Sequence, residues 1–172
     1  MSVDTTAVWK QVTPELQAEL ADFWLRHGAL PTREAAEQRA LQAVAIARDA
    51  HGALWGVSTA TLRVLPRLRQ HVYYYRQFFA ESHRGQRATR GFALASRQVL
   101  AAYNASLEQP ESVGVVLEFE NRELASRYTR AIEDGFVFIG HSPRGFALRI
   151  SYFDDARLMP VASVVTPVQR RA

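Results

Sequence analysis

Apolar residues near the start of the chain recur at helical spacing: Leu16, Leu20, Phe23 and Trp24. Thr13 and Pro14 supply a hydroxyl N-cap and a proline at the first helical position, and Gly28 is a typical helix stop. Thr32 caps a second, shorter helix that runs through Gln38. This part of the chain therefore predicts two consecutive helices.

From Ala43 onward the apolar pattern changes to that of strands. Runs over 43–48 and 53–65, joined by a tight turn at His51-Gly52, predict a β-hairpin. The aromatic-rich run 72–80 predicts a third strand. The same pattern predicts strands over 8–12, 113–119, 136–139 and 146–152, and helices over 88–107 and from Asn121 to Asp134, the latter ended by Gly135.

The order of these elements predicts a mixed α/β fold, with a mostly antiparallel central sheet and helices on both faces. The 172 residues suit one domain, with its core over 8–153. The segment 154–172 is interpreted as a tail or an added strand, since Val161 to Val165 could form a short edge strand. An edge of this kind could pair two copies, so a homodimer is a further prediction.

Composition excludes several classes of chemistry. The chain has no Cys, which excludes a disulfide framework, a cysteine zinc site and a thiol nucleophile. Its five His show no metal-ligand spacing, so no metal is predicted. The Gly-x-Ser-x-Gly elbow of serine hydrolases is missing from the sequence. Because the sequence contains neither a secretory signal nor an apolar run long enough for a membrane span, we expect a cytoplasmic protein.

Positive charge is concentrated in the middle of the chain. Residues 50–107 carry eight Arg and one acid, Glu81, a net charge of +7, whereas the segments 1–49 and 108–172 carry −2 and −1. Arg presents a planar fork of donors suited to phosphate and carboxylate. The middle segment therefore indicates an anionic ligand, either a nucleic acid or a smaller phosphate compound.

The loop after the 72–80 strand is the strongest candidate for that ligand. It contains Arg84, Arg87 and Arg90 around Gly85, and it leads into the N-terminus of a predicted helix. Unpaired N–H groups and the helix dipole favour an anion at such a position. A solvated, arginine-rich loop that merely caps the helix is the alternative.

Two motifs resemble signatures of the GNAT superfamily of N-acetyltransferases. The run from Phe78 to Thr89 is similar to its acetyl-CoA signature, a strand followed by Arg/Gln-x-x-Gly-x-Gly/Ala that opens a helix. Asn121-x-x-x-Ala125-x-x-Tyr128, followed by Gly135-Phe136, resembles the second signature. With the matching order of elements, the resemblance covers about residues 8–153 and implies a GNAT-like fold.

The resemblance implies a role for each matched residue, with acetyl-CoA or another acyl-CoA as co-substrate. The backbone of Phe78, Phe79 and Ala80 would pair with the pantetheine arm. The pyrophosphate would be held by the N–H groups of Gly85, Gln86, Arg87, Ala88 and Thr89. Arg84, Arg87 and Arg90 would contact phosphate, Asn121 the cofactor arm, and Tyr128 would protonate the departing thiolate as general acid. Two positions differ from the family pattern: Arg87 stands where the family has Gly, and Thr89 stands where it has Gly or Ala.

The general base and the acceptor remain open in the sequence. Glu81 is the acid nearest the predicted centre, but it also fits a surface ion pair. Tyr73, Tyr75, His71, water or an amine that arrives neutral could replace it. The acceptor cleft is predicted from aromatic and apolar residues: Phe23, Trp24, Leu30, Tyr73 and Tyr75, with Phe138 and Phe146 also considered. No acidic pocket is evident, which favours a small or hydrophobic amine or a peptide terminus.

Strand alternation places Tyr74, Arg76 and Phe78 on one face of the 72–80 strand and Tyr73, Tyr75 and Gln77 on the other. One face is expected to pack under a helix and the other to line the cleft. Three functions are considered: an acyl-CoA-dependent N-acyltransferase, a degenerate GNAT-like CoA-binding or regulatory module, and a nucleic-acid-binding protein. The third ranks last because the aromatic residues lie in an apolar strand rather than on a basic surface.

Overall fold

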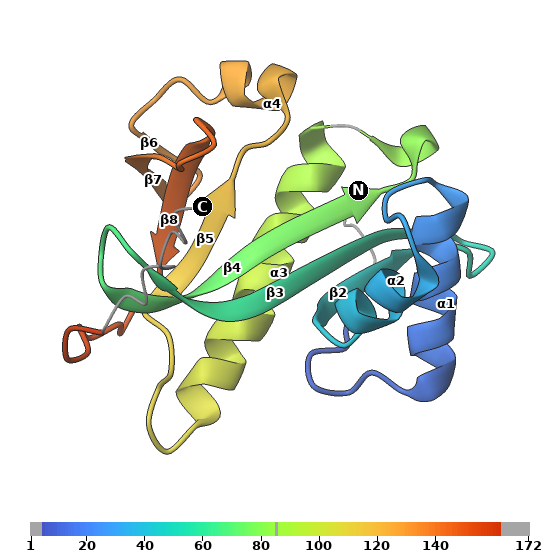
Figure 1. Cartoon of the computed structure of the whole chain (residues 1–172), viewed down its shortest axis with the longest axis horizontal. Coiled ribbons are helices and arrows are strands. Elements are labelled where there is room, and N and C mark those ends of the chain that lie inside the picture. Colours follow the sequence, from blue (N-terminus) through green and yellow to red (C-terminus); the bar gives the residue numbers. More distant parts are fainter. Residues whose placement is uncertain (1–4, 85, 163–172) are drawn as a thin grey trace, which may run out of the picture.

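A single eight-stranded sheet organises the computed structural model, which describes residues 5–84 and 86–162 (Figure 1). The elements are β1 (Thr5–Ala7), α1 (Pro14–Arg26), α2 (Arg33–Ala40), β2 (Ala43–Arg48), β3 (Leu54–Leu65), β4 (Gln70–Phe79), a 3-10 turn η1 (Glu81–His83), α3 (Gln86–Ser106), β5 (Gly114–Glu118), α4 (Arg122–Arg127), β6 (Ile132–Glu133), β7 (Phe136–His141) and β8 (Ala147–Tyr152). The strand order is β1-β2-β3-β4-β5-β8-β7-β6. Among the described strands, β4 and β5 pair in parallel and the other pairs are antiparallel, which confirms the predicted sheet.

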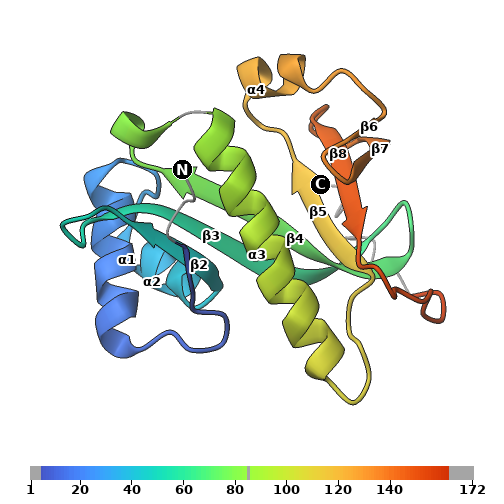
Figure 2. The same ribbon diagram turned by 180° about the vertical axis from the view of Figure 1, so that it is seen from behind.

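Helices cover both faces of this sheet, as predicted. α1 and α2 lie on one face, and α3 crosses the other (Figure 1 and Figure 2). Alternation along β2 supplies both layers: Ala43 and Ala45 belong to the buried cluster with α1 and α2, whereas Val44 joins Leu100 of α3 in the second cluster. The Thr13 hydroxyl accepts a hydrogen bond from the backbone N–H of Leu16, which confirms the N-cap of α1.

The sheet divides between β4 and β5. Parallel pairing joins Tyr73, Tyr74 and Tyr75 to residues 115–117, but β4 continues to Phe79 with only β3 beside it. The other edge of β5 pairs with β8. Beyond their short pairing β4 and β5 diverge in a V (Figure 1), and the edge of β4 that faces β5 has no strand partner from Arg76 to Phe79.

The predicted first strand over 8–12 was wrong, since β1 occupies Thr5–Ala7. Val8 still donates its N–H to the carbonyl of Val44, at 2.9 Å. Lys10 then has a positive φ of 62°, so the chain turns and cannot continue as a strand. The buried Val8 and Trp9 thus contribute to the core from the end of β1 and from this turn.

The predicted helix from Asn121 to Asp134 was also wrong. α4 ends at Arg127, and Asp134-Gly135 joins β6 to β7 as a two-residue hairpin turn. Both turn residues have positive φ, 53° and 77°, as a type I′ turn requires. Gly135 therefore ends no helix, and the Asp-Gly pair was the hairpin signal that the sequence interpretation missed.

Beyond β8 the chain runs back towards the start of β4. Ala162 donates its N–H to the carbonyl of Arg69, and Arg69 Nε donates to the Ala162 carbonyl at 3.1 Å. Residues 161–162 form no strand, and the rest of the edge strand predicted over 161–165 lies outside the described residues. Among the helices of the described chain, none has the length and apolar character to cross a membrane.

Candidate active site

Two hollows flank the opening between β4 and β5. The first, here called the helix-side cavity, has a volume of about 40 Å³ and is lined by residues of α3, β5 and the segment after α4. The second, here called the cleft, has a volume of about 210 Å³ and lies beside α1, α2 and β4. Gln77 lines both. Gln77 therefore stands between a cavity beside α3 and a cleft beside α1 and α2.

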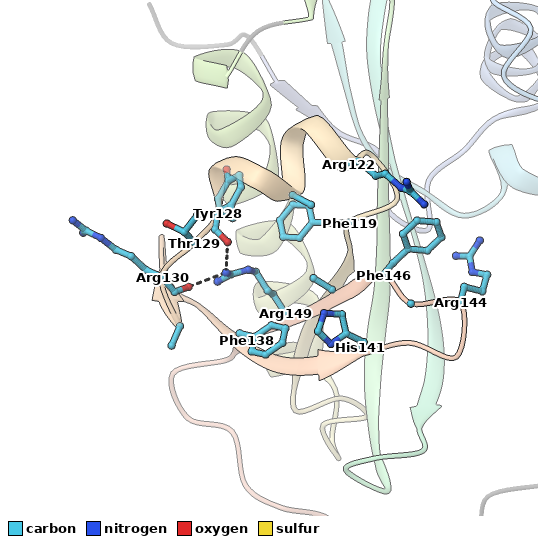
Figure 3. Close-up of a pocket in the computed structure, with 14 residues that line it drawn as sticks. Phe119, Arg122, Tyr128, Thr129, Arg130, Phe138, His141, Arg144, Phe146 and Arg149 are labelled. Atoms are coloured by element: carbon cyan, nitrogen blue, oxygen red, sulfur yellow. Dashed lines mark hydrogen bonds between the residues drawn. The ribbon is translucent and has the colours of Figure 1, made fainter.

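Tyr128 forms one wall of the helix-side cavity, directly after α4. Its ring stacks on Phe119 with centroids 5.0 Å apart, and its carbonyl accepts a hydrogen bond from Arg149 Nη2 at 2.8 Å (Figure 3). Burial raises the pKa of the Tyr128 phenol above its usual value, and the carboxylates of Asp134 and Glu133 raise it further. The phenol therefore keeps its proton at neutral pH and is able to donate it.

The arginines of the β4–α3 loop are partly engaged within the protein. Arg84 is exposed, and its Nε donates to the carbonyl of Phe79 at 3.2 Å. Arg90 forms an ion pair of 2.6 Å with Asp134. Ala80 donates its N–H to Trp55, at 2.8 Å, so this N–H is used inside the sheet.

Part of the predicted phosphate site is not described. Gly85 lies outside the described residues, and so do the side chains of Gln86, Arg87, Ala88 and Thr89. The backbone of residues 86–89 belongs to the first turn of α3, which places its N-terminal end at the loop as predicted.

Glu81 and Asn121 lie at the surface. Glu81 is exposed within η1 and lines neither the helix-side cavity nor the cleft. Asn121 precedes α4, where its carbonyl accepts the N–H of Ala125 at 2.9 Å. The structure therefore places Tyr128, but not Glu81, on a wall of the opening.

The predicted cleft residues fall into four groups, of which Tyr73 and Tyr75, described below, are the last. Trp24 and Leu30 line the cleft together with Phe78. Phe23 is 2% exposed and packs behind them, with its ring 5.6 Å from that of Phe78. Phe138 lines a different cavity, described below.

Tyr73 and Tyr75 are core residues rather than cleft residues. They are 0% and 2% exposed and belong to the cluster under α3. Their hydroxyls donate to Glu111 Oε1 at 2.7 Å and Gln77 Oε1 at 3.0 Å, and burial raises the pKa of both phenols. Alternation had separated the two faces of β4 correctly, but which face α3 covers was decided by the fold.

The cationic residues of the cleft were not predicted from the sequence. Arg39 and Arg76 line it, together with Thr59 and Glu120. Burial lowers the pKa of Arg39, and the nearby Arg76 and Arg63 guanidinium groups lower it further. The strand alternation contained a signal for Arg76, because it placed Arg76 on the same face of the strand as Phe78. The cleft is therefore aromatic and positively charged rather than only apolar.

Metal ligands are not gathered at this site. Over residues 5–84 and 86–162, no group of three or more His, Asp or Glu side chains is arranged to hold a metal ion. What the opening offers instead is a strand edge, a phenol, a loop with arginines and a cleft of ligand size. These features suit an extended organic ligand better than an ion.

Comparison with known proteins identifies solved structures that share the fold of this chain. No protein-family profile and no curated protein sequence matches the chain. A GNAT superfamily phosphinothricin acetyltransferase from Sinorhizobium meliloti, solved in complex with AcCoA, superposes with a TM-score of 0.59 at 13% identity, covering 97% of both chains. A ribosomal-protein-S5-alanine acetyltransferase from Vibrio fischeri gives 0.58 at 13% identity, covering 89% of this chain and 94% of the other.

A bacterial toxin gives a TM-score of 0.58 at 14% identity, covering 88% of this chain and 90% of the other. These likenesses extend over nearly the whole sheet and its helices. They agree with the two sequence motifs, although identities this low carry no substrate or mechanism from one protein to another. The chain therefore has the fold of the GNAT superfamily of acetyltransferases.

Proposed function

We propose that this protein transfers an acyl group from acyl-CoA to an amine by direct attack, with Tyr128 as general acid. The observation that carries the proposal is the opening between β4 and β5, with Tyr128 on one side, the cleft on the other and Gln77 between them. A thioester placed in this opening would be reached by an amine from the cleft and by a proton donor from the helix side.

The chain has groups that fit acyl-CoA. Beyond Tyr75, the edge of β4 is free of β5, so an extended pantetheine arm can pair with it as an added strand. The start of α3 offers backbone N–H groups to the pyrophosphate. Arg84 would exchange the Phe79 carbonyl for a phosphate oxygen, which binds a guanidinium more strongly than a neutral carbonyl does. Arg90 is held by the Asp134 carboxylate and would contact phosphate only by leaving that ion pair.

The proposed reaction has an activated carbonyl, an attacking amine and a proton donor. The bound acyl-CoA supplies the activated thioester carbonyl. The amine nitrogen bonds to that carbon, the carbon–sulfur bond breaks, and the Tyr128 hydroxyl gives its proton to the sulfur. Because Glu120 in the cleft is paired with Arg144 at 2.5 Å, we assign the proton that the amine loses to water in the cleft.

The cleft also favours one kind of acceptor. Trp24, Leu30 and Phe78 provide apolar contacts, and Arg39 and Arg76 provide positive charge. An amine that carries a carboxylate or phosphate beside an apolar group matches this lining, whereas a polyamine would be repelled. This adds an anionic group to the small or hydrophobic amine, or peptide terminus, that the sequence favoured.

Binding and turnover test the proposal separately. Acetyl-CoA at millimolar concentration should raise the melting temperature, because it binds the folded state. Release of the CoA thiol in the presence of amines should then fall about 100-fold in Tyr128→Phe, while the thermal shift remains. Tyr152→Phe is the matched control, since Tyr152 is 41% exposed and lines neither the cleft nor the helix-side cavity.

Each outcome separates the alternatives. A thermal shift without turnover for any amine would support the degenerate CoA-binding module instead. Unchanged turnover in Tyr128→Phe would remove Tyr128 from the mechanism. If neither acetyl-CoA nor a longer acyl-CoA shifts the melting temperature, the acyltransferase and the CoA-binding module are both wrong.

A further inference from the structure

A larger cavity lies outside the proposed active site, between α4 and the β7–β8 hairpin (Figure 3). Its volume is about 630 Å³, within the usual range for sites that bind small organic molecules. Four aromatic rings line this outer cavity: Phe119, Tyr128, Phe138 and Phe146. Phe138 is 38% exposed, a large fraction for a phenylalanine. The cavity thus presents apolar, planar surfaces to whatever enters it.

A buried cation forms part of the wall of the outer cavity. Arg149 is 3% exposed and lines the cavity from β8 (Figure 3). Its Nη2 donates to the carbonyls of Tyr128 and Arg130, both at 2.8 Å. Its Nε and Nη1 are shielded from solvent and have no hydrogen-bond partner among the described residues. Within that same part of the chain, no carboxylate forms an ion pair with Arg149.

The burial of Arg149 without an anionic partner among the described residues costs free energy. Guanidinium does not lose its proton in proteins, so Arg149 stays charged when it is buried. A buried charge without an anion carries a desolvation cost that only an opposite charge or strong hydrogen bonds offset. The rings of Tyr128 and Phe138, with centroids 5.8 and 6.0 Å from the guanidinium carbon, give a partial cation–π compensation.

The rest of the lining adds positive charge and no negative charge. Arg122, Arg130 and Arg144 also line the cavity, and no Asp or Glu is among its described lining residues. Arg144 is neutralised by Glu118 and Glu120, at 2.8 and 2.5 Å, and the Arg130 side chain points away (Figure 3). The positive charge of the cavity that no carboxylate offsets is therefore mainly that of Arg149. Arg122 adds a second positive charge near Phe146 (Figure 3).

We propose that the outer cavity binds a small aromatic anion, whose carboxylate or phosphate pairs with Arg149 and whose ring packs against Phe138 and Phe119. The anion supplies the missing partner of the guanidinium, and the ring fills an apolar space that otherwise exposes Phe138. This site does not depend on the proposed acyl transfer. Because Phe119, Tyr128 and Arg149 line both this cavity and the helix-side cavity, its ligand would contact the back of the candidate catalytic tyrosine.

Isothermal titration calorimetry of the purified protein with four probes tests the site. Phenylacetate and phenyl phosphate carry both features, phenylacetamide lacks the charge, and acetate lacks the ring. At least one of the two aromatic anions should bind at least about tenfold more tightly than phenylacetamide and acetate. The tighter of the two identifies the headgroup. Equal affinity for phenylacetate, phenyl phosphate and phenylacetamide, or no binding of either aromatic anion, would overturn the proposal.

Variants place the ligand in the cavity. Arg149→Gln should weaken the aromatic anion at least about tenfold. This variant also loses two hydrogen bonds to backbone carbonyls, so Phe138→Ala is the second test. Its ring is 38% exposed, so its removal should cost little stability, and it should weaken binding of the aromatic anion while leaving acetate unchanged. Arg76→Gln removes a guanidinium from the cleft and is the control. If Arg76→Gln abolishes binding and Phe138→Ala does not, the anion binds in the cleft and the proposal is wrong.

Discussion

The two ends of the sheet are built in different ways. At one end, β1 to β4 are packed between α1 and α2 on one face and α3 on the other; we call this the closed end. At the other, α3 reaches only as far as β5 and the nearby Ser151 and Tyr152 of β8, and the further helix is the six-residue α4; we call β5, β8, β7 and β6 the open end. Of the buried side-chain atoms without a hydrogen-bond partner in the described chain, Trp9 Nε1 belongs to the closed end, whereas Glu118 Oε1, Glu133 Oε2 and two nitrogens of Arg149 belong to the open end.

This difference separates stability from binding. Apolar contacts on both faces of β2 to β4 remove large side chains from water, which is the main favourable term in folding. The short α4 cannot cover β7 and β8 in the same way, and a cavity of about 630 Å³ remains there. Arg149, buried in the wall of that cavity, has two nitrogens without a hydrogen-bond partner among the described residues. The candidate active site lies at the seam where the two ends diverge.

The sharpest test of this comparison removes one phenylalanine from each end. Phe92 of α3 is 0% exposed, with its ring 5.4 Å from that of Phe79. Phe92→Ala should lower the free energy of unfolding by about 3–5 kcal/mol, from lost burial and the cavity created. Phe138→Ala at the open end, where the ring is 38% exposed, should cost less than about 1 kcal/mol. Urea denaturation measures both, and equal costs would contradict the division into closed and open ends.

A smaller effect is expected within the open end, where β5 pairs with β8. A Cβ on Gly114 of β5 would collide with the backbone carbonyl of Ser151 and lie 2.8 Å from Tyr152 Cα, both in β8. Gly114→Ala should therefore cost about 1–3 kcal/mol, because two backbones must separate. Gly91→Ala in α3 is the matched control: a Cβ there meets nothing within 4 Å, and alanine should stabilise the helix by about 0.5–1 kcal/mol. A stable Gly114→Ala protein would show that β5 and β8 tolerate separation.

Surface ion pairs should give the smallest difference between the ends. Arg48 pairs with Glu19 at 2.5 Å in the closed end, and its hydrogen bond lowers the pKa of Glu19 below the usual value, against the opposing effect of burial. Glu19→Gln should cost less than about 1 kcal/mol at neutral pH, since the pair is partly solvated. Glu123 of α4, 75% exposed and paired with Arg127, should give no measurable cost in Glu123→Gln.

The pH dependence of that pair has a definite sign. Because the folded-state pKa of Glu19 is lowered, its contribution is complete above the unfolded-state pKa and is lost as the pH falls through the folded-state pKa. The difference between wild type and Glu19→Gln, measured by urea denaturation, should therefore disappear in acid. A difference that persists at low pH would indicate that Glu19 acts through packing rather than charge.

Local signals predicted the closed end well. The Thr13 and Thr32 hydroxyls cap α1 and α2, and the hairpin of β2 and β3 follows its predicted strands closely. These signals are short in range, so each is complete within a few residues of the chain. At the open end the interpretation extended a helix past Arg127 because it took Asn121 as an N-cap and Gly135 as a helix stop. Asp134 and Gly135 in fact adopt the positive φ angles of a hairpin turn.

The candidate site was only partly predictable for a similar reason. The motif placed Tyr128 beside the opening, and the alternation of β4 separated its two faces. Which face α3 would cover depends on contacts between distant segments, so Tyr73 and Tyr75 were assigned to a cleft although they form the core. Arg39 enters the cleft from α2, far from β4 in sequence, and no local pattern could have placed it there.

The sequence by itself determined the helix caps, the strand alternation, the mixed sheet and the two motifs that resemble GNAT acetyltransferases, because each depends on residue type and short spacing. Only the tertiary structure decided that Arg90 and Arg97 of the middle segment pair with Asp134 and Asp154 and that Arg84 is exposed. It also decided that Arg149, from a segment with a net charge of −1, is buried without a carboxylate partner among the described residues. Net charge counts residues along the chain, whereas the energy of a charge depends on its burial and its partners, which only the fold brings together.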